Sequence, residues 1–232
     1  HLENKYLSGF IDGLFWFIQN RRRVVYAFAF VILSASIYGI TKLDALGYII
    51  DDLPAKDKIS QDIRFFESEF NGIMPLEIMV DTKRKKGVMK LSTLKRMNEL
   101  EELIDEIPEL SRPVSVVSLV KYSKQAYYNG NPKYYQLPTS QENSFILSYA
   151  KNSSSEANLL KSFVDSTGQY ARITTFMKDI GTDKMERIEE DLQAKIDKVF
   201  PKENYNVTIT GKALVFQKGT TYLVKNLAIS LS

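Results

Sequence analysis

The 232-residue sequence contains no cysteine and a single histidine, His1. The lack of thiols excludes disulfide frameworks and cysteine nucleophiles, and the lack of further histidines excludes histidine-based triads and the common zinc sites. The 11 glycines are scattered, so no glycine-rich phosphate-binding loop is present. The sequence therefore predicts a protein that is not an enzyme and that carries no metal ion and no cofactor.

A strong excess of charge of either sign is also lacking, because 31 basic residues offset 28 acidic residues to a net charge of +3. So small an excess argues against a nucleic-acid partner. Acidic residues stand close together at Asp51 and Asp52 and at Glu67 and Glu69. Neither pair by itself places two carboxyl groups across a cleft, as acid–base hydrolysis needs. We interpret both pairs as solvated positions.

One long uncharged run is present, from Val24 to Thr41. As a helix its roughly 18 residues cover about 27 Å, close to the hydrocarbon thickness of a bilayer. With the flanking residues it predicts a transmembrane helix over residues 21–43. Three arginines, Arg21, Arg22 and Arg23, precede the run, and the positive-inside rule therefore places the N-terminal end in the cytoplasm. The arginines are the predicted membrane-orienting residues.

Two other interpretations of this run remain open, a buried core helix and a cleaved signal peptide. Arginines directly beside the run are unusual for the first, and more than twenty preceding residues are unusual for the second. Upstream, Leu7, Phe10, Leu14 and Phe17 recur at helical spacing. They predict an amphipathic helix over residues 1–20 that lies in the cytoplasmic interface, and packing on other protein helices explains it equally well.

Beyond residue 43 the apolar pattern alternates between the strand and helix periods. Strands are predicted within residues 74–83, 170–179 and 204–211, helices over 59–70, 92–107 and 183–199, and a short extended piece over 112–119. In the first strand, Leu76, Ile78 and Val80 are predicted to face a core. Residues 120–169, rich in Tyr, Asn and Ser, are interpreted as a helical insertion. The order strand, helix, strand, insertion, strand, helix, strand predicts an α+β, ferredoxin-like split β-α-β domain over residues 44–218.

The tail over residues 219–232 is apolar with one lysine, and it predicts the start of a second transmembrane helix. Because the sequence begins at a histidine and ends within this apolar run, we expect it to be a segment of a longer chain.

Three stretches, "LGYIIDDLP", "FFESEFNGIMPLEIMVD" and "SVVSLVK", together with the arginine-bounded run, resemble bacterial transporters of the resistance-nodulation-division (RND) superfamily. The similarity is greatest to the branch of the MMPL and hopanoid-exporter proteins, and it extends from about Arg21 to Ser232. Proteins of this kind have a duplicated six-span unit with periplasmic porter domains of ferredoxin-like subdomains. The resemblance implies the inner membrane of a bacterium, with the main domain on the periplasmic side. The helix before the span favours the second repeat.

The resemblance further implies export of hydrophobic or amphiphilic, lipid-like substrates driven by the proton-motive force. The implied partners are the remaining transmembrane and porter domains of the same polypeptide, the lipid bilayer and the substrate, with a possible homo-oligomer. The family's proton-carrying acidic residues lie in spans that this segment lacks. Phe65, Phe66, Phe70 and Met74 are the candidates for lining the substrate path, although core packing also explains such aromatic residues.

The alternative function is a single-pass membrane-anchored extracytoplasmic interaction or sensor domain. Further spans after Ser232, one of them with a buried acidic residue, would favour the transporter over this anchor. An anchored hydrolase has little support, because no nucleophile is paired with a base.

Overall fold

The computed structural model describes residues 18–19, 21–41, 48, 54, 56–152 and 154–231. The chain divides into two compact units, His1–Ala45 and Leu46–Ser232. The first unit contributes helix α2, Arg22–Thr41. The interfacial helix predicted over residues 1–20 lies almost entirely outside the described residues.

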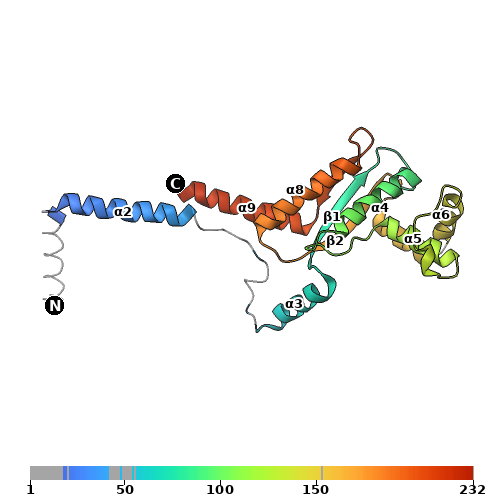
Figure 1. Cartoon of the computed structure of the whole chain (residues 1–232), viewed down its shortest axis with the longest axis horizontal. Coiled ribbons are helices and arrows are strands. Elements are labelled where there is room, and N and C mark those ends of the chain that lie inside the picture. The colour runs from blue at the N-terminus through green and yellow to red at the C-terminus, as the bar shows by residue number, and fades with distance from the viewer. Residues whose placement is uncertain are drawn as a thin grey trace. The chain divides into compact units, whose positions relative to one another are not determined.

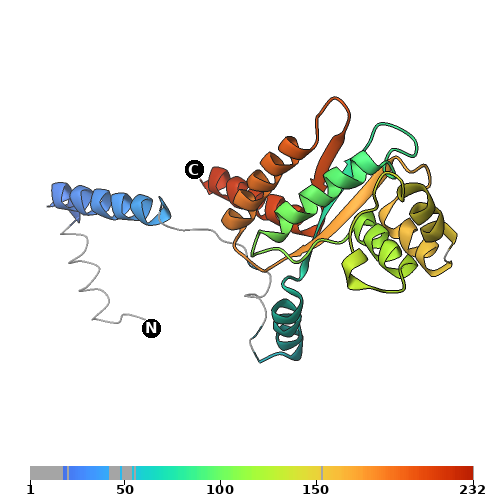
Figure 2. The same ribbon diagram turned by 45° about the vertical axis from the view of Figure 1, so that its right-hand side comes forward.

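The second unit is an α+β fold in which helices pack on a three-stranded antiparallel sheet (Figures 1 and 2). Its elements are α3 (Lys58–Phe70), β1 (Met74–Asp81), α4 (Leu91–Asp105), α5 (Val116–Tyr127), the 3-10 helix η1 (Pro132–Tyr134), α6 (Asn143–Asn152), α7 (Ser154–Phe163), β2 (Tyr170–Met177), α8 (Thr182–Val199), β3 (Asn206–Thr210) and α9 (Lys212–Leu231). The strand order is β2-β1-β3, so the first strand of the sequence lies in the middle. The predicted α+β class is confirmed.

One face of β1 is buried as its alternating pattern predicted. Leu76, Ile78 and Val80 are at most 3% exposed. Ile78 lies opposite Ile173 of β2 and Ile209 of β3 in the strand register. All three isoleucines are buried, so a continuous apolar row crosses the sheet on this face.

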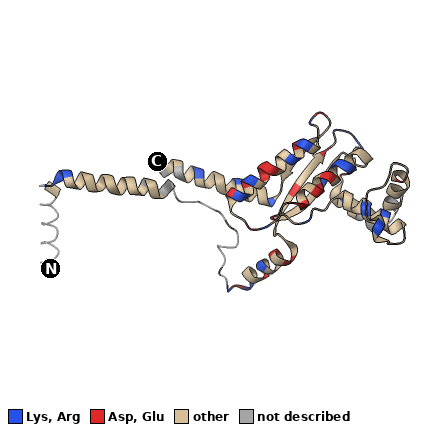
Figure 3. Cartoon of the chain, viewed as in Figure 1, with Lys and Arg blue, Asp and Glu red and all other residues tan. Residues whose placement is uncertain are grey.

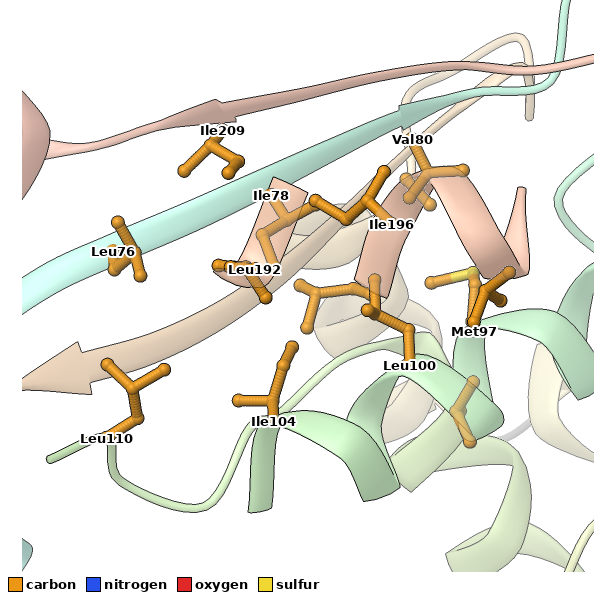
Figure 4. Close-up of a cluster of buried hydrophobic side chains, with 14 of the residues drawn as sticks. Leu76, Ile78, Val80, Met97, Leu100, Ile104, Leu110, Leu192, Ile196 and Ile209 are labelled. Atoms are coloured by element: carbon orange, nitrogen blue, oxygen red, sulfur yellow. The ribbon is translucent and has the colours of Figure 1, made fainter. Parts of the chain in front are cut away.

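Helices α4 and α8 pack against each other and contribute their apolar stripes to the same core (Figure 4). The buried residues of these stripes are Leu94, Met97, Leu100 and Ile104 of α4, and Met185, Leu192, Ile196 and Val199 of α8. The spacings within each set are three, four or seven residues, which places its members on one side of a helix.

Residues 109–114 lie along the free edge of β2, where the sequence predicted part of an extended segment. Two bridges join Leu110 to Met177 and Val114 to Thr174. Between these bridges the segment has one residue more than β2, which is the geometry of a β-bulge. Pro113 also lacks an N–H group, so a regular ladder of hydrogen bonds does not form.

The predicted extended conformation is wrong for residues 116–119, the second half of the segment 112–119. Helix α5 begins at Val116, and the Ser115 hydroxyl accepts a hydrogen bond from the Val117 N–H at 3.0 Å. β-Branched residues favour strands, but a serine at the N-cap satisfies a free N–H of the first helical turn. The cap and the packing of Val116, Val117 and Val120 into the core outweigh that preference here.

Two other helices begin at residues that differ from the predicted ones. The helix predicted over residues 92–107 is α4, which begins at Leu91 with Lys90 as its N-cap, and the Lys90 side chain makes no capping hydrogen bond. Helix α9 runs without interruption from Lys212 through Gly219, whereas the second apolar helix was predicted to begin at 219.

Among the helices that the structure describes, none combines the length and the apolar character needed to cross a membrane. The span predicted over residues 21–43 includes Lys42 and Leu43, which lie outside the described residues, and it stays a prediction.

Adjacent residues of β1 provide a test of this core. Truncating the fully buried Ile78 to alanine leaves a cavity, and we expect the free energy of unfolding to fall by about 2–5 kcal/mol. The Met79 side chain is 40% exposed on the opposite face, so Met79→Ala is the matched control, with a loss below about 1 kcal/mol. Urea unfolding followed by circular dichroism measures both free energies. Equal losses would contradict the burial of Ile78 on one face of β1 and the exposure of Met79 on the other.

Candidate functional site

Helix α3 carries a cluster of exposed apolar side chains. The helix is capped at its start by Asp57, whose side chain accepts from the Ile59 N–H at 3.3 Å, and it ends at Asn71 in the left-handed conformation. We define the α3 aromatic face as Ile59, Phe65, Phe66 and Phe70. Each of these side chains is between 53% and 60% exposed.

The three phenylalanines of this face contact one another rather than the core. The Phe66 and Phe70 rings are stacked with centroids 5.4 Å apart, and the Phe65 ring meets Phe66 edge-on at 6.1 Å. Ring contacts of this kind favour one arrangement of the side chains, and they leave the outer surfaces of the rings available to a partner. Three of the four predicted path residues are therefore brought together on one exposed surface.

The fourth predicted path residue, Met74, lies elsewhere. It is the first residue of β1 and is only 4% exposed within the core. It shares the buried side of the strand with Leu76, two residues later. Met74 therefore does not lie on the same surface as the three phenylalanines.

The polar side of α3 attaches the helix to the rest of its unit. The Asn71 side-chain amide donates to the Leu110 carbonyl oxygen at 2.9 Å, and the Asp179 N–H donates to Glu67 Oε1 at 2.6 Å. Glu67 follows Phe66 directly and so points about 100° away from it around the helix. These contacts hold the end of α3 to the rest of its unit.

Apolar side chains are also exposed along α2 and along the second half of α9. In α2, Tyr26, Phe28 and Phe30 are between 67% and 70% exposed, and charged residues occur only at its start (Figure 3). In α9, Leu223 and Leu227 are 64% and 61% exposed. Exposed apolar surface of this extent is typical of an interface with a membrane or another protein.

The arginines at the start of α2 are exposed, and their place is unfavourable for helix stability. Arg22 and Arg23 lie in the first turn, where the helix macrodipole is positive. No acidic residue occurs in this turn to offset them. Helix stability therefore does not explain these residues, which is consistent with the predicted orienting role.

Sequence reasoning missed a buried carboxyl group between α4 and α5. Glu101 is 7% exposed, and its Oε1 accepts a hydrogen bond from the Ser115 hydroxyl at 2.5 Å. Burial raises the pKa of Glu101 to about 7, while the hydrogen bond from Ser115 and the charges of Lys121 and Arg112 act in the opposite direction. Its spacing of four from Met97 and three from Ile104 could have shown that Glu101 lies on the buried side of the helix.

A second polar cluster, also missed, ties α5 to the residues that precede α6. Lys124 is 2% exposed, and its Nζ lies 2.8 Å from Glu142 Oε2. The Tyr128 hydroxyl donates to the other carboxylate oxygen at 2.9 Å, and the Thr139 N–H donates to Glu142 as well. Lys124 is the main cause of a Glu142 pKa of about 2, with Thr139 and Tyr128 adding to it. This cluster holds the helical insertion together.

A hollow of about 740 Å³ lies between α7, the loop that follows it and the turn after β1. Its walls include the apolar side chains of Met89, Leu160 and Val164, the cations Lys86 and Lys161, and the carboxylate of Asp165. An apolar wall beside charged groups is suited to an amphiphilic molecule, and the two cations outnumber the one carboxylate. Within the described parts of the chain, no group of acidic, histidine or cysteine residues is arranged to hold a metal ion.

Glu101 predicts a specific dependence of stability on pH. Its folded pKa is raised above the ordinary 4.5, so its contribution to stability is complete below pH 4.5 and is lost as the pH rises through about 7. Glu101→Gln keeps an acceptor for Ser115 and removes the titration. We expect the free energy of unfolding of the variant, relative to the wild type, to rise by about 3 kcal/mol between pH 4 and pH 8.

Urea unfolding at these two pH values measures this difference. Glu102→Gln is the matched control, because Glu102 is the exposed neighbour on the same helix and is expected to show a change below about 0.5 kcal/mol. A difference that does not vary with pH would show that Glu101 titrates normally.

Removing Glu142 is expected to destabilise the helical insertion. Glu142→Ala leaves the Lys124 ammonium buried without its partner, which costs about 3–5 kcal/mol. Adding Lys124→Met removes the buried charge and should restore most of this loss. Hydrogen exchange of the amides in residues 116–152 measures the effect, and absence of rescue in the double variant would argue against a charge-pair explanation.

No protein-family model matches this chain, and no curated protein matches its sequence.

Proposed function

We propose that this chain is a porter-domain segment of an RND-type exporter that is driven by the proton-motive force and moves hydrophobic or amphiphilic, lipid-like substrates. In this proposal α2 belongs to a span of the bacterial inner membrane, the α+β unit is the periplasmic porter domain, and the second half of α9 enters the next span. The remaining spans and porter domains of the same polypeptide would supply the proton path.

The arrangement around the sheet supports a ferredoxin-like fold. The chain passes from β1 through α4 to residues 109–114 beside β2, and from β2 through α8 to β3 beside β1. The order is then β3, β1, β2 and the bulged segment 109–114. Two β-α-β connections of this form, interleaved in one antiparallel sheet, are those of the split β-α-β domain.

The observation that carries the proposal is that both ends of the α+β unit continue in the sequence into helices with exposed apolar side chains. On one side, α2 has an uncharged run from Val24 to Thr41. On the other side, α9 exposes apolar side chains from Tyr222 to Ile229, with Lys225 as its one charged residue there. A porter domain between two spans requires this arrangement, and a soluble domain would lose solubility through it.

The substrate class is supported by two features of the outer unit. The hollow beside α7 combines apolar walls with the charged groups of Lys86, Lys161 and Asp165, which suits an amphiphilic molecule. The family resemblance described from the sequence implies lipid-like cargo. The lining of a substrate path by Phe65, Phe66 and Phe70 stays a prediction.

The absence of cysteine allows a direct test of topology with single cysteines. In bacterial cells that express the chain, a membrane-impermeant thiol reagent is expected to label Lys85→Cys in the outer unit. Gln19→Cys should react only after the cells are lysed. Val31→Cys of α2 and Leu227→Cys of α9 should react poorly until detergent is added, because lipid excludes the reagent.

Each result has a distinct meaning. Labelling of both Val31→Cys and Leu227→Cys in intact cells would contradict a membrane location for these helices. Protection of Val31→Cys together with free labelling of Leu227→Cys would instead favour the single-pass anchored interaction or sensor domain. Denatured protein, labelled at all four positions, is the control for cysteine reactivity.

A further inference from the structure

We infer that the α3 aromatic face is a membrane-docking surface that inserts its phenylalanines into the headgroup and acyl-chain boundary of the outer leaflet beside α9. This inference rests on the proposed function, because it requires the second half of α9 to enter the bilayer. In this inference Phe65, Phe66 and Phe70 contact the lipid surface and do not line the substrate path.

Helices α3 and α9 join the sheet at the same end. Helix α3 ends four residues before β1 begins at Met74, and β3 ends at Thr210, which pairs with Glu77 near that end of β1. A Cβ atom on Gly211, the residue between β3 and α9, would lie 2.6 Å from the Pro75 carbonyl oxygen. The chain therefore leaves the sheet into α9 directly beside the point at which α3 leads into β1.

The lengths of these helices place α3 close to the predicted membrane boundary. In α9, Ala213 and Gln217 are buried and Val215 is exposed between them, whereas several exposed apolar side chains follow one another closely from Tyr222 onward. At 1.5 Å per residue, Tyr222 lies about 15 Å along α9 from Lys212. Helix α3 has 13 residues and is about 20 Å long. If the bilayer begins near Tyr222, its distance from the end of the sheet, about 15 Å along α9, is shorter than α3 itself.

The chemistry of the face fits the boundary region of a bilayer. Its four side chains have no hydrogen-bonding groups, so their contacts with a partner are apolar and not directional. The exposed charges around them are Lys58, Asp62, Arg64 and Glu69, two of each sign. This balance matches zwitterionic headgroups, which also carry both signs. Docking is therefore expected to be driven by apolar burial and to depend little on salt or on anionic lipid.

A single nitroxide label measures the depth of each position directly. The chain is reconstituted in phosphatidylcholine vesicles with one cysteine at Phe66 or Phe70, and collision rates with oxygen and with a nickel chelate are recorded. We expect the ratio of oxygen to nickel collisions to be several-fold higher at these two positions than at Gln61 and Ser68. Gln61 and Ser68 lie about 140° and 160° from Phe66 around the helix, on the side that borders Phe65, so they are controls for the depth of Phe66 and Phe70. All four side chains are exposed, so the substitutions spare the core.

Labels at Val31 and Leu227 report separately on the proposed function. If both are in lipid while Phe66 and Phe70 are as accessible to nickel as Gln61, the docking inference is wrong and the proposed function stands. If Phe66 and Phe70 are shielded from both collision partners, the face is covered by protein and the inference is also wrong. If Val31 and Leu227 are themselves accessible to nickel, the proposed function fails first. Vesicles that contain anionic lipid should give the same ratios, and a strong increase would contradict the zwitterionic match.

Discussion

The central position of β1 is the constraint on which the rest of the unit depends. Both of its edges are paired, and one of its faces is covered by α4 and α8. Its first residues also hold the ends of two other elements, because α3 leads into Met74 and Gly211 lies against the Pro75 carbonyl oxygen. A strand fixed on both edges and on one face has no freedom to slip, so the directions in which α3 and α9 leave the sheet are set by its packing.

Polar contacts have a different role. They do not form the core, but they connect the helical insertion to it. Ser115 both caps α5 and donates to the buried Glu101 of α4, so the start of the insertion is held to the helix that covers the sheet. Lys124 and Glu142 then fix α5 to the residues before α6. Each buried charge is costly by itself, and each is placed where it selects one arrangement of two helices.

The strand and helix periods were enough to predict β1, the helical insertion and the core positions Leu76, Ile78 and Val80. The strand period also implies that Met74 is buried, because Met74 is two residues from Leu76 and so lies on the same side of the strand. The two periods failed where local chemistry outweighs propensity, as at Ser115, whose cap begins a helix in a run of valines. The exposure of the three phenylalanines of α3 was not predictable, because helical spacing alone does not distinguish a face that packs on the sheet from one that does not.

The bulged segment beside β2 has a consequence for how copies of this protein meet. An outer strand with regular backbone groups offers a template onto which a strand of another molecule can add. Residues 109–114 interrupt that template, since the bulge bends the backbone and Pro113 cannot donate a hydrogen bond. This side of the sheet is therefore protected from edge-to-edge aggregation, and any association through it must use side chains instead of a shared ladder.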